Sequence, residues 1–588
     1  MTHIFFYPIR KSGKNEIIKS FSSRNSNGDA MILGLDVGGT QTDTVLIENG
    51  QVVVANKTPT GPDLMETLRG ALGKVLDIVD PSRIERMAFS TTLATNAIVQ
   101  DDLEDTGMIV SAGPGIDPRW HAIGPSFHVV EGCLDHQGFE ALPLRKESVM
   151  HAASRIRGQG ISLVGVVSKF SVRNPDHELL AASWLEEMFA HVAQGHKVSG
   201  TLNFPRRITT TYLNAALYNV HRNFTDALAR TLKEKSLFAP RYLLKPDGGT
   251  VVLEESAASP ASMAQSGPAA GVMGALALDG CAGTTLVLDV GGTTTDMSVV
   301  LDGVPLFSPS GIRLGPFQTL IRSLLTHSVG IGGDSEVRID KEKNFRIGPF
   351  RKGKPVALGG PEPTPTDAMI ALGLMKIGNR NAAVNQMKEL GKTLGLDTIS
   401  VARKILKVMA KSIADSAHAF LHEINSQPVY TIHEVLHNQK VAPTSALIMG
   451  GPAPHLADYL QVALGIPCRV PDHFEVANAV GAAVARVTCA LTLQADTSRG
   501  FVVIPEANIQ ERIGSGFGLE EAILMGRKTL EKRAATIGAL QEKLDITITE
   551  KQVFNMIRGY SRAGRNIRLK MSLTPGLVQE WRRIRNGA

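Results

Sequence analysis

The feature that most limits how this chain can fold is a segment of sequence that occurs twice. Each copy runs from an apolar stretch through an aspartate and a glycine- and threonine-rich turn into a second apolar stretch and a two-residue hairpin. The two turns read Asp36-Val37-Gly38-Gly39-Thr40-Gln41-Thr42-Asp43 and Asp289-Val290-Gly291-Gly292-Thr293-Thr294-Thr295-Asp296, and the hairpins are Asn49-Gly50 and Asp302-Gly303. Each hairpin starts 13 residues after the leading aspartate of its copy. The common order of strand, turn, strand, hairpin and strand predicts two equivalent structural units.

The residue types of the two turns are typical of a loop that binds polyphosphate. Paired glycines let the backbone approach anionic oxygens and point successive N–H groups at them, and threonine hydroxyls add further donors. The glycines are Gly38, Gly39, Gly291 and Gly292, and the threonines are Thr40, Thr42, Thr293 and Thr295. A carboxylate would repel phosphate directly, so we expect Asp36 and Asp289 to be catalytic residues that hold magnesium against a nucleotide. The alternative for either aspartate is the closing of a tight turn.

Two other segments place polar residues where an apolar run or loop gives way to a helix. Ser266-Gly267-Pro268 is typical of a helix start with serine as the cap, and its N–H groups are candidates to bind an anionic substrate group or phosphate. A polar cluster after the apolar run 87–89 is a candidate to line the substrate side of the site. It consists of Thr91, Thr92, Thr95 and Asn96. For both segments, helix capping without a catalytic role is the alternative.

The net charge of +6 does not indicate a nucleic-acid-binding protein, because the positive charge lies at the two ends of the chain. Residues 1–30 hold five basic residues against two acidic ones, and residues 558–588 hold eight against one. The long segment between them is mildly acidic, which does not favour a surface for binding a polyanion. We therefore expect no nucleic-acid partner.

Cysteine usage and hydropathy bear on the cellular compartment. The four cysteines are scattered, and no pair has the C-x-x-C spacing of a zinc or redox site. No stretch approaches the roughly eighteen apolar residues of a membrane span, and residues 1–30 lack the apolar core of a secretory signal. These features predict a cytoplasmic protein without a membrane association. Residues 1–30 are expected to be a disordered extension, with an organelle-targeting peptide as the alternative.

The two loops and their spacing resemble the superfamily of actin, sugar kinases and heat-shock ATPases. Six further stretches narrow the resemblance to the A-type hydantoinase/oxoprolinase family over residues 31–490. They are Ser90–Ala97, Phe170–Glu178, Asp247–Gly249, Ser266–Gly271, Gly330–Ser335 and Pro365–Ala368. The resemblance implies an α/β fold with two actin-like, ribonuclease H-like lobes and ATP between them, and it matches Gly450-Gly451-Pro452 to the adenosine-binding turn. A strand that ends in Gly-Gly leaves a flat ledge for adenine, and a plain strand-to-helix turn is the alternative.

The resemblance and the two loops together predict the division of the chain. We expect an N-terminal lobe over 31–205 with the first loop, and a second lobe over 206–490 with the second loop and the adenosine turn. Residues 491–588 are expected to form a small C-terminal α/β region, because a β-like run at 501–505 is followed by an amphipathic helix near 520–542 and an alternating run at 545–549.

Members of the family couple ATP cleavage to the opening of a lactam or cyclic imide ring, or act as the ATP-using subunit of ketone carboxylases. The resemblance therefore implies an ATP- and Mg²⁺-dependent hydrolase that phosphorylates the carbonyl oxygen of a cyclic amide. A separate B-type hydrolase subunit is expected as a partner, since no Ser/His/Asp set or zinc-ligand spacing is evident for the hydrolytic step. The alternatives are an ATPase switch that reactivates another enzyme, the ATP-using subunit of a ketone carboxylase, and a sugar or acyl kinase.

The sequence departs from the family pattern at two places. Phe350-Arg351-Lys352-Gly353-Lys354-Pro355 stands where the family carries a longer loop with glycine, proline and cysteine, and the part after Ala490 is short. Both departures leave the identity of the substrate open.

Overall fold

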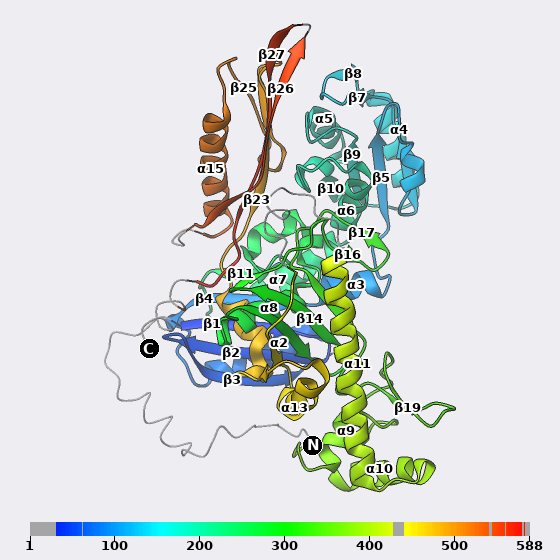
Figure 1. Cartoon of the computed structure of the whole chain (residues 1–588). Coiled ribbons are helices and arrows are strands. Elements are labelled where there is room, and N and C mark those ends of the chain that lie inside the picture. Colours follow the sequence, from blue (N-terminus) through cyan, green and yellow to red (C-terminus); the bar gives the residue numbers. More distant parts are fainter. Residues whose placement is uncertain are drawn as a thin grey trace.

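The structure is a computed structural model that describes residues 31–61, 63–426, 440–539, 544–558, 560–578 and 581 (Figure 1). The expected extension over residues 1–30 and the basic residues 582–588 lie outside the described part of the chain. Within that part, no helix is both long and apolar enough to cross a membrane.

Each copy of the repeat forms an antiparallel strand pair at the centre of a mixed sheet. The first sheet has the order β12-β11-β4-β1-β2-β3, in which β4 runs parallel to β1 and β2 runs antiparallel to it. Its strands are β1 (Met31–Val37), β2 (Gln41–Glu48), β3 (Gln51–Pro59), β4 (Ile84–Thr91), β11 (Arg241–Leu244) and β12 (Thr250–Val252). The second sheet has the order β15-β14-β13-β21-β22, and β18 also pairs with β14. Its strands are β13 (Thr284–Val290), β14 (Thr295–Leu301), β15 (Val304–Pro305), β18 (Thr326–Val329), β21 (Ser445–Met449) and β22 (Cys468–Arg469).

The two strand pairs are equivalent in register as well as in sequence. Asp36 lies opposite Asp43 in the first pair, and Asp289 lies opposite Asp296 in the second. Both turns are closed by a matching backbone hydrogen bond, from Gly38 N to Gln41 O at 3.0 Å and from Gly291 N to Thr294 O at 2.9 Å. Both hairpins place two residues at positive φ, with Asn49 at 50° and Gly50 at 67°, and Asp302 at 47° and Gly303 at 78°. This is the backbone conformation of the two-residue hairpin that Asn-Gly and Asp-Gly predict.

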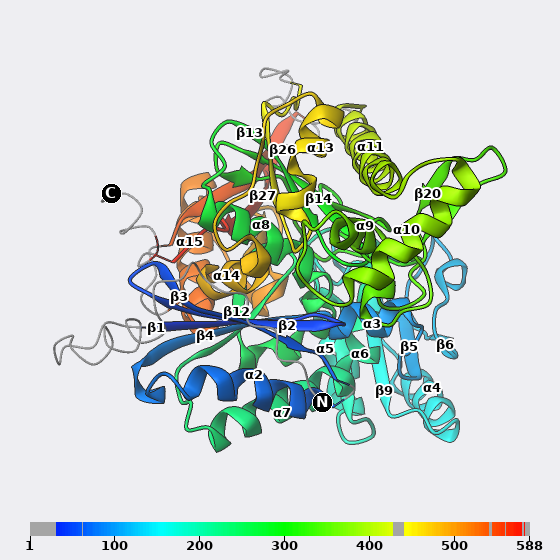
Figure 2. The ribbon, with the colours of Figure 1, turned by 90° about the horizontal axis from the view of Figure 1, so that it is seen from below.

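Two helices rich in small residues lie between the sheets (Figure 2). They are α8 (Ser266–Leu278), which packs on the second sheet, and α14 (Ala477–Val484), which packs on β1 and β4 of the first. A methyl group on Gly481 would come within 2.1 Å of Ala270 O, and one on Gly274 within 2.2 Å of Ala477 O. The helices cross so closely because these positions have no side chain, and this contact fixes the two sheets relative to each other.

The outer faces of the two sheets are covered by longer helices, so the central strands are buried on both faces. On the first sheet these are α2 (Leu64–Leu76) and α7 (Tyr218–Glu234). On the second they are α9 (Pro365–Ala371), α10 (Arg380–Leu394), α11 (Thr398–Ser426) and α13 (Ala453–Leu464). Burial on both faces explains why β1 and β13 read as continuous apolar runs rather than as alternating ones.

Two smaller sheets stand at one end of the molecule (Figure 1). The first is parallel, with the order β10-β9-β5-β6, and is accompanied by helices α4, α5 and α6. It consists of β5 (Thr106–Ser111), β6 (Ser126–Val129), β9 (Leu163–Ser168), β10 (His191–Gln194), α4 (Lys146–Gly158), α5 (Asp176–Leu185) and α6 (Phe204–Ala216). The second has the order β25-β24-β23-β27-β26 and packs against α15. It consists of β23 (Ala490–Asp496), β24 (Phe501–Ile504), β25 (Ile509–Arg512), β26 (Ile546–Arg558), β27 (Ser561–Leu573) and α15 (Leu519–Thr536).

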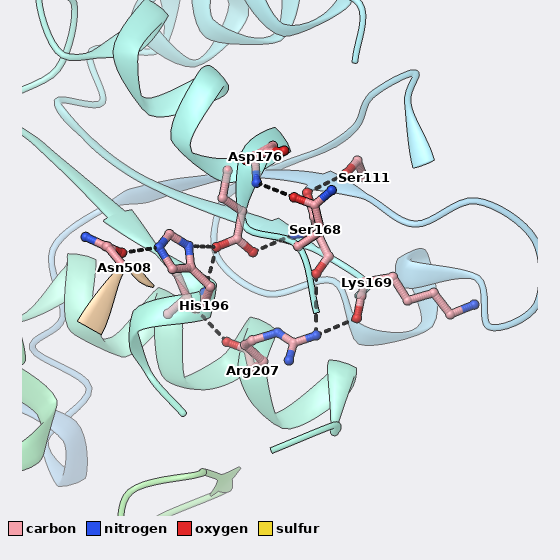
Figure 3. Close-up of polar contacts among 10 residues, drawn as sticks. Ser111, Ser168, Lys169, Asp176, His196, Arg207 and Asn508 are labelled. Atoms are coloured by element: carbon pink, nitrogen blue, oxygen red, sulfur yellow. Dashed lines mark hydrogen bonds and ion pairs between the residues drawn. The ribbon is translucent and has the colours of Figure 1, made fainter. Parts of the chain in front are cut away.

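A buried polar network joins these two smaller sheets (Figure 3). Glu178 accepts hydrogen bonds from Ser168 N at 2.7 Å and His196 N at 2.6 Å, and its carboxylate lies 2.7 Å from His196 Nδ1. The other ring nitrogen of His196 lies 2.8 Å from Asn508 Oδ1, in the loop after β24. Arg207 is fully buried beside them and donates to the carbonyl oxygens of Ser168 and Lys169. Arg207 is therefore a structural residue of this network.

The strands that make up the first sheet also indicate where the two lobes divide. The expected boundary between residues 205 and 206 precedes β11 and β12, yet both strands belong to the sheet that holds the first turn. We propose that the first lobe extends through β12, and that 106–216 forms a unit inserted into it.

Candidate functional site

The candidate site lies at the carboxyl ends of β1 and β13, where the two repeated turns begin. Asp36 is 9% exposed, and its Oδ1 has no hydrogen-bond partner among the described residues. Burial, and then the charge of Asp43, raises the pKa of Asp36 to about 6. Its hydrogen bond with Ser90 opposes this shift, and the charge of Asp289 adds a smaller upward contribution. The aspartates of the two repeats therefore lie within electrostatic reach of each other, although they belong to different sheets.

Asp289 lies where four elements meet. Asn478, in the first turn of α14, donates from Nδ2 to Asp289 Oδ2 at 3.0 Å. A methyl group on Gly271 of α8 would lie 3.4 Å from the same oxygen, and one on Gly450, after β21, would lie 2.9 Å from Oδ1. Burial raises the pKa of Asp289, and the bond from Asn478 opposes that shift. The absence of side chains at the two glycines leaves the carboxylate room to reach outward from its strand.

The last aspartate of each repeat also belongs to the site, and sequence reasoning missed both. Lys57 Nζ lies 2.6 Å from Asp43 Oδ2 and donates to Glu475 O at 2.6 Å, so it ties β2 and β3 to the segment that leads into α14. Burial, and then the charge of Asp289, raises the pKa of Asp296 to about 7. The signal was present in the sequence, because both residues recur in the same register of the repeat.

The structure divides the four threonines of the turns into two kinds. Thr42 and Thr295 are fully buried, and their hydroxyls are bonded inside the protein, at 3.0 Å to Thr60 Oγ1 and at 2.6 Å to Ile331 O. Thr40 and Thr293 are exposed on the turns. Thr40 and Thr293 are therefore the two threonines of the turns that remain accessible, while the hydroxyls of Thr42 and Thr295 are held inside the protein.

The Gly450-Gly451-Pro452 segment follows β21 and adjoins the second turn. β21 runs parallel to β13, with Met449 opposite Asp289. Gly450 has φ 88°, a conformation that favours glycine, and Gly451 is exposed, with open space where a side chain would begin. Pro452 is the N-cap of α13 and packs against Gly333, whose N–H donates to Gly291 O at 2.9 Å. The predicted adenosine turn thus lies beside the second predicted phosphate turn.

The predicted substrate-side residues come together at the end of β4. Thr91 lies opposite Val37 of β1, and its carbonyl oxygen accepts a hydrogen bond from Ser266 Oγ at 2.9 Å. Thr95 Oγ1 accepts from Gln265 N at 2.7 Å. The expectation that Ser266 caps α8 is wrong, since the cap position is Gln265 at φ 56° and Ser266 already lies in the helix. Asn96 Nδ2 donates to Thr92 Oγ1 at 3.4 Å, and Thr92 Oγ1 donates to Val37 O at 3.4 Å. Gly267 faces open space.

The carboxylates suit magnesium better than a metal held by many protein ligands. Among the described residues, no group of three or more His, Cys, Asp or Glu side chains is arranged to hold a metal ion. Magnesium commonly takes only one or two carboxylates and keeps several waters, with phosphate oxygens as its remaining ligands. The unpartnered Oδ1 of Asp36 is a buried acceptor of this kind. Asp36 and Asp289 therefore fit a magnesium–nucleotide unit.

Comparison with known proteins agrees with this geometry. The family model of the hydantoinase/oxoprolinase N-terminal region matches residues 32–189, and the hydantoinase/oxoprolinase family model matches residues 207–490. The alpha subunit of caprolactamase from Pseudomonas jessenii is 26% identical over 430 residues, which is 65% of this chain and 61% of that protein. The gamma subunit of acetophenone carboxylase from Aromatoleum aromaticum is 26% identical over 463 residues, 68% of this chain and 62% of that protein. This chain thus spans about three fifths of the length of both relatives.

A solved structure of nucleotide-free acetone carboxylase has the same fold. It superposes with a TM-score of 0.69 and 17% identity, over 94% of this chain and 88% of the other. The superposition confirms the predicted α/β fold of the actin-like ATPase type.

Proposed function

We propose, from the premise that this chain belongs to the hydantoinase/oxoprolinase family, that it uses ATP to phosphorylate the carbonyl oxygen of a cyclic amide and so drives opening of the ring. The observation that supports this most directly is the convergence of the two repeated turns. Their leading aspartates interact electrostatically across two sheets, and the exposed Thr40 and Thr293 lie on the turns beside them.

The chemistry explains why ATP is needed. A lactam carbonyl is a poor electrophile because its nitrogen delocalises into it. In the proposed reaction the carbonyl oxygen attacks the terminal phosphorus of ATP and ADP leaves. Water then adds to the activated carbon and the ring C–N bond breaks, which leaves an open-chain acyl phosphate. A second water hydrolyses this acyl phosphate to release phosphate and the free carboxylate. The sum is one ATP and two waters consumed for each ring opened, and the protein's part is positioning and charge neutralisation.

The residues of the site divide this work. The backbone N–H groups of the two glycine turns bind phosphate, with Thr40 and Thr293 as further donors. Asp36 and Asp289 hold magnesium, which supplies charge neutralisation at the phosphates when it is bound. Gly450, Gly451 and Pro452 form the ledge for adenosine. The polar residues at the end of β4 and the start of α8 then lie on the acceptor side of the phosphates.

The hydrolytic half of the reaction is assigned to a second subunit. No three metal-ligating side chains gather among the described residues, so that part of the chain offers no zinc-type site to activate water. Two of the relatives are named as subunits, alpha in caprolactamase and gamma in acetophenone carboxylase, which supports a partner of the B type.

The function is tested by measuring ATP hydrolysis against a panel of compounds, with and without the product of a neighbouring B-type gene. Caprolactam, 5-oxoproline and hydantoins test the proposal. We expect one of them to stimulate phosphate release several-fold with the partner present, and weak ATP turnover by the chain alone. Release of a stable phosphorylated product instead of inorganic phosphate would identify a kinase and overturn the proposal, as would stimulation only by a protein.

A second candidate function is the ATP-using subunit of a ketone carboxylase. It is favoured by the similarity to acetophenone carboxylase and by the fold shared with acetone carboxylase. The same panel separates the two functions when acetone and acetophenone are included with bicarbonate. ATP turnover that requires both a ketone and bicarbonate would favour the carboxylase.

A further inference from the structure

Arg351 places a positive charge directly beside the second repeated turn. Its Nη1 donates to Thr293 Oγ1 at 2.9 Å, and its Nη2 lies 3.0 Å from Asp334 Oδ2. A methyl group on Gly292 would lie 3.9 Å from Arg351 Nη1. Arg351 belongs to the short loop 350–355, where the sequence departs from the family pattern, and the proposed function gives this residue no role.

The guanidinium is held in place from two sides and still has donors to spare. Its Nε donates to Gly353 O at 3.1 Å. Of the five N–H donors of an arginine, three are therefore engaged, and the side chain remains 22% exposed. A further anion at the turn can thus be bound without first breaking the contacts that orient the group.

Asp334 is the residue that orients Arg351. Its backbone N–H donates to Gly292 O at 2.6 Å, which fixes it to the turn, and its Oδ1 accepts from Thr366 Oγ1 at 3.0 Å. One carboxylate oxygen is thus bound to Thr366 and the other faces Arg351. Burial raises the pKa of Asp334, and Arg351 opposes that shift.

The aspartates at the two turns are negatively charged, so a triphosphate bound there needs a nearby positive charge such as that of Arg351. The charges of Asp36, Asp43, Asp289 and Asp296 act on one another across the two turns, and Lys57 already pairs with Asp43. A triphosphate brought to these carboxylates meets repulsion that magnesium relieves only in part. A guanidinium presents paired donors that suit phosphate oxygens.

We propose that Arg351 is a phosphate-binding residue of the nucleotide site, and that Asp334 holds it ready when no nucleotide is bound. The inference rests on the proposed function, because it requires that ATP binds at the two turns. The competing explanation is a latch, in which the Arg351–Asp334 pair only fastens loop 350–355 to the turn.

The two explanations predict different results for the two partners of the pair. If Arg351 binds phosphate, Arg351→Gln should weaken ATP binding about ten- to a hundredfold, the range expected for losing a charged hydrogen bond. Asp334→Asn should leave ATP affinity within about threefold of wild type or make it tighter, because it removes a competing anion. Arg351→Lys keeps the charge but loses the paired donors, so its loss should be smaller. A latch predicts equal losses for Arg351→Gln and Asp334→Asn.

The experiment is equilibrium binding of ATP with magnesium to the full chain, with thermal unfolding of each variant. Arg346→Gln is the matched control, because Arg346 forms a similar pair with Asp340 at 3.0 Å and its side chain is 69% exposed. If Arg351→Gln is unstable, the comparison of Arg351→Lys with Asp334→Asn decides in its place. Wild-type ATP affinity in Arg351→Gln, or equal losses for the two partners, overturns the inference alone. A wild-type chain that binds no ATP overturns the proposed function and the inference together.

Discussion

Asp36 and Asp289 occupy the same position in two copies of one strand–turn–strand unit, and the charge of Asp289 acts on Asp36. The pKa of Asp36 is raised to about 6, first by burial and then by the charges of Asp43 and Asp289. Two carboxylates kept this close in a partly buried place oppose folding unless a cation joins them. We therefore propose that the repeat, rather than either turn alone, is the functional unit of the site.

The first prediction concerns this pair. Asp36→Asn and Asp289→Asn should each lower kcat/KM for ATP hydrolysis by about a hundredfold, the usual scale for losing an electrostatic element of a transition state. The double variant should be scarcely worse than the poorer single one, because both residues serve one magnesium–nucleotide unit. The four proteins of the cycle are compared by steady-state kinetics, after circular dichroism confirms that each is folded. Losses that multiply would show that the two turns serve separate sites.

The second prediction concerns pH and stability. Burial, and then the charge of Asp289, raises the pKa of Asp296 to about 7, above the ordinary value of 3.8. The folded protein therefore binds a proton that the unfolded chain has released, and stability is lost as pH rises from about 4 through 7. Asn cannot ionise, so Asp296→Asn should raise the melting temperature of the nucleotide-free protein by a few degrees at pH 8 and change it little at pH 4.

The control for this measurement is Asp458→Asn, on an exposed position of α13. It should shift the melting temperature equally at both pH values. A difference between Asp296→Asn and wild type that does not grow with pH would contradict the expected cost of ionising Asp296.

The third prediction concerns the contact of α8 with α14. Gly481→Ala would place a methyl group 2.1 Å from Ala270 O, a backbone atom that cannot move aside. We expect a loss of about 1–3 kcal/mol of unfolding free energy and reduced ATP turnover, because the two sheets would shift relative to each other. Gly73→Ala in α2 is the matched control, since nothing lies within 4 Å of the added methyl. It should be neutral or stabilise by up to about 1 kcal/mol. Urea unfolding measures both, and equal effects would refute the packing argument.

The fourth prediction compares a buried and an exposed glutamate. Burial alone would raise the pKa of Glu178. The hydrogen bond with His196 and the charge of His196 outweigh burial and hold this pKa below its ordinary value. Glu178→Ala leaves buried Arg207 and His196 without their carboxylate and should destabilise the protein by about 3–5 kcal/mol. Glu131→Ala removes a glutamate that is 58% exposed in its pair with Arg145, and it should have little effect. Similar urea midpoints for the two variants would show that the network does not support the fold.

The repeat made much of the architecture predictable. Hydrogen bonding along an antiparallel pair depends on neighbours close in sequence, so strand, turn and hairpin could be placed in both copies from residue types alone. The same local logic located β24, α15 and the start of β26 in the C-terminal region. It also pointed to Asp36 and Asp289, because an aspartate before Gly-Gly recurs at one register.

Other parts of the site depend on contacts between residues far apart in the chain, which no local pattern encodes. The hydroxyl of Ser266 was expected to cap its helix, yet it bonds to Thr91, and Thr42 and Thr295 turned inward to hold the turns. No local pattern shows that Arg207 is fully buried and that its charge acts on Glu178. From the sequence, the one notable property of Arg351 was its place in a loop that departs from the family pattern.

The sequence by itself determined that two equivalent turns exist and what chemistry their residue types favour, because both properties belong to short segments. Only the tertiary structure decided that the turns face one place, which side chains there remain exposed, and which cation lies beside them. Those properties follow from the packing of α8 against α14 and from burial. Burial and the charges of neighbours hundreds of residues away in the sequence together set the pKa of each aspartate.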